Sequence, residues 1–200
     1  MARRSDHTQE QIKEMVLIAA EGIVTEEGEE ALTVRKIAQH IGYTVGSIYM
    51  VFTNMQDLLL HINARSLQQL SLQLATVSGQ DSPEQGIVAL AEAYLEFAGQ
   101  NFNRWRLIFQ PRAKSHASLP VWYREKVESV YAPLESRFKA LKPEISQEQA
   151  GLAARALWSG VHGVCVFGLE GNPGAAGMDA SRLAARLLTE NFILGWKQSH

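Results

Sequence analysis

The stretch from residue 32 to residue 60, LTVRKIAQHIGYTVGSIYMVFTNMQDLLL, decides the fold. Thr33 is placed to cap a short helix, and Gly42 can end that helix in a left-handed conformation. Thr44 is placed to cap a second short helix, in which Ile48 belongs to the inward face. Two helices joined by a short turn that contains glycine form a helix-turn-helix, and the second helix of this motif enters the major groove of DNA.

The outward face of the second helix indicates how it would meet DNA. It consists of Val45, Gly46, Tyr49 and Met50. Val45 and Met50 offer apolar contact to thymine methyl groups, and Lys36 on the preceding helix adds a cation. The helix has no Arg, Asn or Gln for bidentate base readout. We therefore expect much of the specificity to come from DNA shape, or from Arg3 and Arg4 on an N-terminal arm in the minor groove.

The same stretch resembles the tetracycline-repressor (TetR) family. The resemblance rests on T-x-x-x-I-A at 33–38, GYTVGSIY at 42–49, and Phe52, Asn54 and Leu58. It implies that Gly46 lets the recognition helix approach the groove wall, and that Thr33, Thr44 and Tyr49 bond phosphates. The predicted DNA-binding residues are Arg3, Arg4, Thr33, Lys36, Thr44, Val45, Gly46, Ser47, Tyr49 and Met50.

Three positions depart from the family pattern. Met50 and Val51 follow Tyr49 where a basic or aromatic residue is usual, and Met55 stands where a lysine usually opens the next helix. Fewer phosphate contacts predict a shallower salt dependence of DNA binding. The alternative for this stretch is a generic three-helix bundle in which Tyr49 is a surface tyrosine.

Composition and charge limit the remaining possibilities. The 200 residues carry a net charge of −2, and the single cysteine, Cys165, excludes an internal disulfide framework and fits a reducing cytoplasm. Residues 1–60 hold five cations against nine anions, and we expect the acids at 26–30 to lie far from the DNA groove. Since no window of about twenty residues is strongly apolar and free of charge, we expect no membrane span and no membrane partner.

The whole chain is predicted to be all-α. Helix-start signals occur at Thr8, Ser82 and Ser146, and Pro133 predicts a kink or break in its helix. We expect a helix-turn-helix DNA-binding domain over residues 1–60 and a helical ligand-binding and dimerisation domain over residues 61–200. A long helix over about residues 55–77 would link them.

The second domain is rich in large aromatic residues, which suit an apolar effector cavity between helices as well as an ordinary core. The segment from Trp158 to Gly163 resembles a Trp–His–Gly pattern of one branch of the family. His162 is interpreted first as a packed core histidine, although it could also help to bind a ligand. The candidate ligand-binding residues are Tyr94, Phe97, Trp105, Phe109, Trp122, Tyr123, Tyr131, Trp158 and His162.

The last two long helices carry more apolar positions than one buried face requires. In the family these two helices pair with their copies in a second subunit, and two recognition helices about one DNA turn apart would read a palindrome. The alternative is that all of this surface is buried within one chain. The predicted dimer-interface residues are Leu157, Val161, Val164, Leu187, Ile193 and Leu194.

Together these features predict a cytoplasmic, homodimeric and sequence-specific transcriptional regulator, a repressor. We expect it to bind a palindromic operator in double-stranded DNA and to be released by a small apolar or aromatic effector. The alternative is a ligand-binding or scaffolding dimer with weakened DNA binding. A third hypothesis, a small hydrolase or lyase that uses His162 and Cys165, has little support because no third group orients the pair. We expect no enzymatic activity, no cofactor and, from the histidine spacing, no metal site.

Overall fold

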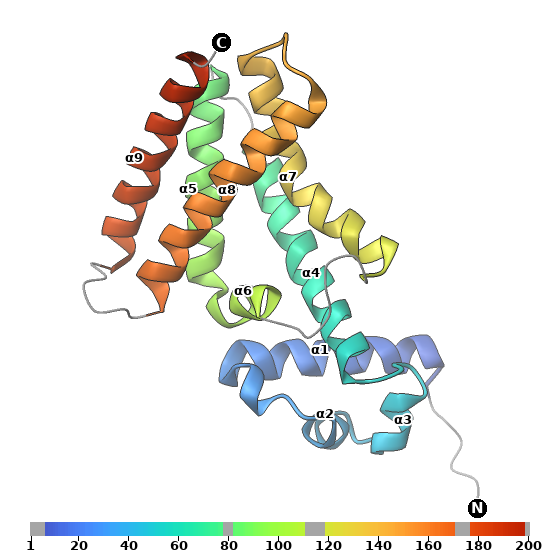
Figure 1. Cartoon of the computed structure of the whole chain (residues 1–200). Helices are drawn as coiled ribbons and strands as arrows, with labels where there is room; N and C mark the ends of the chain where they lie inside the picture. The colour runs from blue at the N-terminus through green and yellow to red at the C-terminus, as the bar shows by residue number, and fades with distance from the viewer. Residues whose placement is uncertain (1–6, 78–81, 111–118, 171–176, 199–200) are drawn as a thin grey trace, which may run out of the picture. The chain divides into compact units, whose positions relative to one another are not determined.

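The computed structural model describes residues 7–77, 82–110, 119–170 and 177–198, and the regular structure in these ranges is helical, without a strand. This confirms the all-α prediction. The elements are α1 (Gln9–Glu27), the 3-10 helix η1 (Glu29–Ala31), α2 (Val34–Ile41), α3 (Val45–Tyr49), α4 (Met55–Ala75), α5 (Pro83–Gln100), α6 (Phe102–Phe109), α7 (Val121–Leu141), α8 (Gln147–Leu169) and α9 (Gly177–Gln198) (Figure 1).

The capping residues read from the sequence begin the helices as predicted. The Thr8 and Ser146 side chains each form a capping box at the start of α1 and α8. Thr33 accepts a hydrogen bond from the Lys36 backbone at the start of α2, and Gly42 ends that helix with φ 71°. A left-handed φ costs glycine little because it has no Cβ, so the short turn between α2 and α3 is unstrained.

The contacts divide the chain into two compact units. The first contains residues 1–66 and 103–115, and the second contains residues 67–102 and 116–200. The division falls within α4 and assigns nearly all of α6 to the unit of the helix-turn-helix. The domain limits predicted from the sequence, 1–60 and 61–200, stay a prediction because a compact unit need not coincide with a functional domain.

The core of the first unit fixes the helix-turn-helix against α1. Val16 and Val24 of α1, Ile37 of α2 and Ile48 of α3 are at most 1% exposed and belong to one apolar cluster. Leu107 of α6 is buried in the same cluster. Apolar burial of this kind is the main favourable term in folding, so α1 and α6 help to hold the orientation of α3.

The second unit is built around α8, which packs on α7 and α9, while α5 packs on the same two helices (Figure 1). The helix α7 continues through Pro133, which excludes a break there, while the alternative of a kink stays a prediction. By length and composition alone α8 could cross a membrane, but the core helix of a globular protein passes the same test. One side of α8 is buried against its neighbours here, including Ala150, Ala154 and Leu157.

Candidate nucleic-acid interface

The outward face of α3 is exposed as the sequence predicted. Val45, Tyr49 and Met50 are 39%, 50% and 66% exposed, whereas Ile48 between them is 1% exposed. The burial of Ile48 therefore determines which side of this short helix is exposed to solvent. These three exposed side chains lie within six residues of one another, and their contact with DNA stays a prediction.

The polar groups that begin α3 bond to one another. Thr44 Oγ1 accepts a hydrogen bond from the Ser47 backbone N at 3.2 Å and lies 3.0 Å from Ser47 Oγ. A Cβ added at Gly46 would contact only Thr44 Oγ1, at 3.6 Å, which is ordinary van der Waals contact. The described neighbours do not require glycine at this position, and the close approach of Gly46 to the DNA groove stays a prediction.

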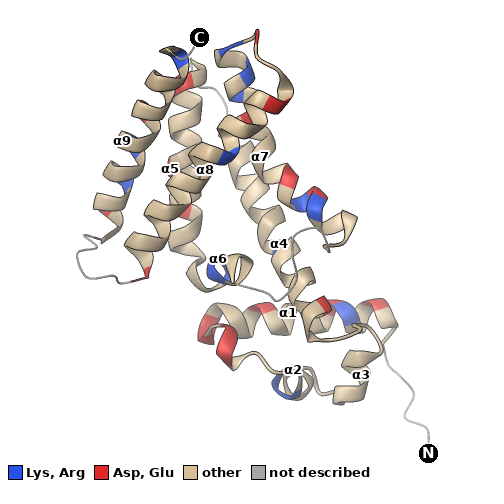
Figure 2. Cartoon of the chain, viewed as in Figure 1, with Lys and Arg blue, Asp and Glu red and all other residues tan. Residues whose placement is uncertain are grey.

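Lys36, the predicted phosphate contact of α2, is paired with an acid. Its ammonium nitrogen lies 2.5 Å from each carboxylate oxygen of Glu27. Figure 2 shows the acidic residues gathered at the end of α1 and in η1, close to the start of α2. Glu27 therefore lies beside a predicted DNA-binding residue, while the expectation that the acids at 26–30 lie far from the DNA groove stays a prediction.

The start of the chain is joined to the turn of the motif. His7 Nδ1 lies 2.7 Å from the hydroxyl of Tyr43, which stands between α2 and α3. Sequence reasoning missed this contact, because 36 residues separate the two partners. Arg3 and Arg4 of the predicted arm lie outside the described residues.

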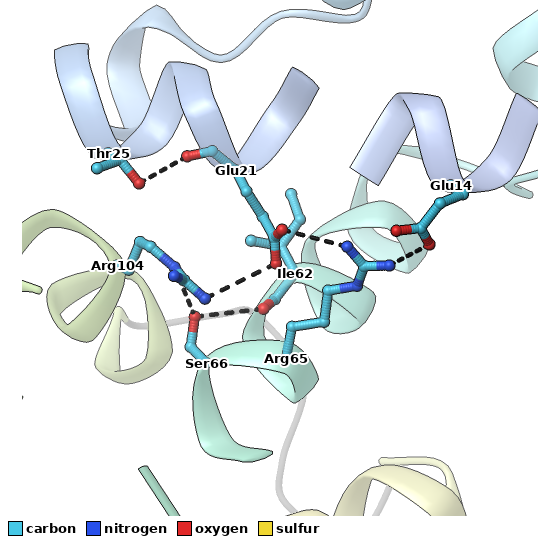
Figure 3. A network of polar contacts seen from close by, with 7 residues as sticks. All are labelled: Glu14, Glu21, Thr25, Ile62, Arg65, Ser66 and Arg104. Carbon is cyan, nitrogen blue, oxygen red and sulfur yellow. Dashed lines mark hydrogen bonds and ion pairs between the residues drawn. The ribbon is translucent and has the colours of Figure 1, made fainter. Parts of the chain in front are cut away.

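A polar network links α1, α4 and α6 within the first unit (Figure 3). Arg65 of α4 donates to Glu14 and, at 3.2 Å, to Glu21 of α1. Arg104 of α6 lies 3.7 Å from the second oxygen of Glu21 and donates to Ser66 of α4 at 3.3 Å. The carboxylate of Glu21 therefore lies between two guanidinium groups that come from different helices.

The opposite charges of this network stabilise one another. Partial burial lowers the pKa of Arg65, but the hydrogen bonds and charges of Glu14 and Glu21 outweigh it and raise the pKa above its ordinary value. The side chains of Glu21 and Arg104 are only 19% and 16% exposed, so solvent screens this ion pair less than a surface pair. Neighbouring Asn63 adds a buried hydrogen bond from its amide to the carbonyl of Leu107.

Two of the predicted effector residues share a small void, and the ligand-binding role of the whole set stays a prediction. Tyr94 and Trp158 line a common void of about 10 Å³, which is close to the lower limit for one water molecule. The Tyr94 hydroxyl lies 2.8 Å from His162 Nδ1, and burial lowers the pKa of His162. His162 is thus packed and hydrogen-bonded, in agreement with the first interpretation of its role.

The other candidates are not among the residues that line this void. Trp105 and Phe109 belong to α6 in the first unit, where their rings are 5.6 Å apart. Tyr131 packs on Trp158 with a ring separation of 5.4 Å. Three further candidates are placed on α5 and α7: Phe97, Trp122 and Tyr123.

The predicted dimer residues divide between the inside and the surface of the chain. Leu157, Val161 and Ile193 are at most 5% exposed because they are buried within their own chain, whereas Leu187 and Leu194 are 63% and 57% exposed. Val164 is half-buried. Leu152 and Leu183, which are among the surplus apolar positions expected on these two helices, are also exposed, and so is Phe167, which the sequence did not single out.

An open groove of about 530 Å³ lies between α5 and α9 in the second unit. Val88, Ala89, Ile193 and Leu194 form its apolar part, and an ion pair between Glu84 and Lys197 lies at its edge. The described residues contain no group of three or more His, Cys, Asp or Glu side chains placed to bind a metal ion.

A capped helix-turn-helix with an exposed second helix, carried on a helical unit, defines the class of helix-turn-helix transcriptional regulators. Residues 16–62 match the bacterial regulatory proteins of the tetR family, and residues 87–190 match the tetracyclin repressor-like C-terminal domain. The chain belongs to the TetR family, whose members are ligand-responsive DNA-binding regulators. The Trp–His–Gly type of its C-terminal domain stays a prediction.

Solved structures share this fold at low identity. A protein of unknown function from Rhodococcus sp. RHA1 is 18% identical, with a TM-score of 0.71 and 98% of each chain covered. The TetR family regulator PfmR from Thermus thermophilus is 19% identical, with a TM-score of 0.62 and coverage of 87% and 96%. The fatty acid degradation regulator FadR from Bacillus halodurans is 15% identical, with a TM-score of 0.65 and coverage of 88% and 93%. No curated protein matches the sequence.

Proposed function

We propose that this chain is a cytoplasmic, homodimeric repressor that binds a palindromic operator and is released by a small apolar or aromatic effector. The observation that carries the proposal is the exposed face of α3, where Val45, Tyr49 and Met50 are held outward by the burial of Ile48. Thr33 and Lys36 at the start of α2, a helix of eight residues, add a helix N-terminus and a cation for the phosphate backbone.

The decisive experiment selects purified protein against random duplexes and measures the affinity for the enriched sequence across a salt series. We expect a near-palindrome, and we expect Lys36→Ala to lower the salt slope by about 0.9 for each half-site. Tyr49→Phe should weaken binding by the loss of one phosphate hydrogen bond, worth about 1 kcal/mol. The matched control is Leu72→Ala, because Leu72 is 62% exposed and lies in the second unit. If no duplex is enriched, the proposal fails.

Dimerisation would use the exposed side of α8 and α9. Leu183, Leu187 and Leu194 repeat at four and seven residues along α9, and all three are at least 57% exposed. A stripe of this kind is suited to pairing with a second copy of itself about a two-fold axis. In sedimentation velocity, Leu187→Glu should run as a monomer and Leu72→Glu as a dimer. A monomeric parent protein at micromolar concentration contradicts this part of the proposal.

An effector that binds at the void lined by Tyr94 and Trp158 would have to enlarge it, since its volume of about 10 Å³ admits no organic molecule. A ligand that binds only the enlarged state draws the protein towards that state, by about 1.4 kcal/mol for each tenfold preference. We propose that α4, which contributes residues to both units, carries the change to the recognition helices. Crosslinks between the two α3 helices of a dimer should change in yield on effector binding.

The alternative is a ligand-binding or scaffolding dimer with weakened DNA binding, and the pairing of Lys36 with Glu27 favours it. A dimer that binds effector but enriches no operator would support this second function.

A further inference from the structure

The recognition helix offers few groups that could read a base by hydrogen bonding. The residues of α3 carry no charge, and Figure 2 shows no Lys, Arg, Asp or Glu along it. Thr44 and Ser47 are bonded to each other at its start. The bidentate donors and acceptors by which Arg, Asn and Gln distinguish guanine and adenine are missing from this helix.

The exposed side of the same helix is apolar instead. Met50 is 66% exposed and Val45 is 39% exposed, at the two ends of a stretch of six residues. In the major groove, one base-pair feature that an apolar side chain can distinguish is the 5-methyl group of thymine. Contact between the thymine methyl group and an apolar side chain removes apolar surface from water, which is favourable. The same side chain against a pyrimidine without the methyl group buries less apolar surface and gains less free energy.

We propose that Met50 and Val45 are specificity-determining residues that read thymine 5-methyl groups, so that the operator is recognised at these positions by methyl contact rather than by hydrogen bonds. This inference rests on the proposed DNA binding. The two side chains stand five residues apart, on either side of Tyr49, so each half-site should contain at least two such thymines. Tyr49 between them presents its hydroxyl to the phosphate backbone.

The test replaces each thymine of the selected operator, one at a time, by deoxyuridine, which removes only the methyl group. We expect a loss of affinity of about threefold to fivefold at two or more positions of each half-site and no loss elsewhere. A cytosine placed at such a position should bind poorly, and 5-methylcytosine should recover part of the affinity, because it carries the methyl group at the same place.

Protein variants assign each methyl group to its side chain. In Met50→Ala, the loss of affinity caused by deoxyuridine should disappear at one position and persist at the other. Val45→Ala should show the reverse. This is the pattern of a double-mutant cycle in which each side chain is coupled to one methyl group. Met50→Leu should retain the effect because it remains apolar, and Leu72→Ala should leave the whole pattern unchanged.

The outcomes separate this inference from the proposed function. Tight operator binding with no deoxyuridine effect, or an effect that survives unchanged in both alanine variants, overturns the inference and leaves the regulator intact. The absence of any enriched operator overturns the proposed function and this inference with it.

Discussion

The ammonium of Lys36 lies 2.5 Å from both carboxylate oxygens of Glu27, so the cation of α2 that is predicted to contact the phosphate backbone is paired with an acid of α1. Both side chains are more than a third exposed, at 37% and 49%. Such a pair contributes little to stability, about 0–1 kcal/mol, because water and salt screen it. In the proposed DNA complex, Glu27 would compete with the phosphate backbone for the same ammonium group.

Glu27→Gln should therefore tighten operator binding. The neutral amide oxygen holds Lys36 less strongly than the carboxylate does, and we expect an affinity gain of about threefold to tenfold at low salt, with a steeper salt dependence. The free energy of unfolding should change by less than ~1 kcal/mol. Fluorescence anisotropy over a salt series measures the first effect and urea denaturation the second. Glu30→Gln is the matched control. An equal gain in both variants would show a general charge effect instead of release from this ion pair.

Glu21→Ala should destabilise the first unit. The change leaves Arg65 and Arg104 without the carboxylate that lies between them, and we expect a loss of about 2 kcal/mol in the free energy of unfolding. Glu14→Ala removes a partner of Arg65 that is 52% exposed, and it should cost less than ~1 kcal/mol. Differential scanning calorimetry of both variants decides the point. Equal melting temperatures for the two variants would contradict the structural role of Glu21.

Protonation of His162 should lower the free energy of unfolding at acid pH. Burial lowers the pKa of His162 in the folded chain, so the unfolded chain binds a proton first as the pH drops below about 6.5. The contribution of neutral His162 to the free energy of unfolding is complete above that pH. It is lost as the pH falls through the lower pKa of His162 in the folded chain. His162→Gln should show a smaller loss of stability between pH 7.5 and pH 5.5. His61, whose pKa burial also lowers, remains in both proteins and cancels in the comparison.

Cys165 should be inert in the native protein. Burial raises the pKa of its thiol to about 12, so almost no thiolate exists at neutral pH. We expect Ellman's reagent to react with less than ~1% of the native protein in the time that it labels the urea-unfolded chain fully. Rapid labelling of the native state at pH 8 would show that α8 opens far more easily than its packing indicates.

Much of the fold follows from local signals. The capping residues Thr8, Thr33, Thr44 and Ser146 bond to backbone groups within three residues. Gly42 adopts the left-handed conformation that ends α2. Sequence alone therefore locates these helix ends. The side of α3 that faces outward follows from helical period for the same reason.

What sequence could not supply depends on the arrangement of separate elements. Because α8 is apolar around most of its circumference, periodicity does not distinguish Leu157, which is buried in its own chain, from Leu152, which is exposed. Glu27 and Lys36 belong to different helices, so their pairing depends on how η1 turns the chain. The shortage of space beside Trp158 depends on the packing of three helices, and a count of aromatic residues does not reveal it.

The first unit is discontinuous in sequence, since Leu107 of α6 completes the apolar cluster that the helix-turn-helix shares with α1. An exchange of DNA-reading heads between relatives of this protein could not move residues 1–66 as one continuous cassette. Such a transplant would have to carry residues 103–115 as a second insert, or match the recipient's own α6 to the new head. A hybrid regulator built from this chain therefore needs two junctions at the ends of residues 103–115 in addition to the one in α4.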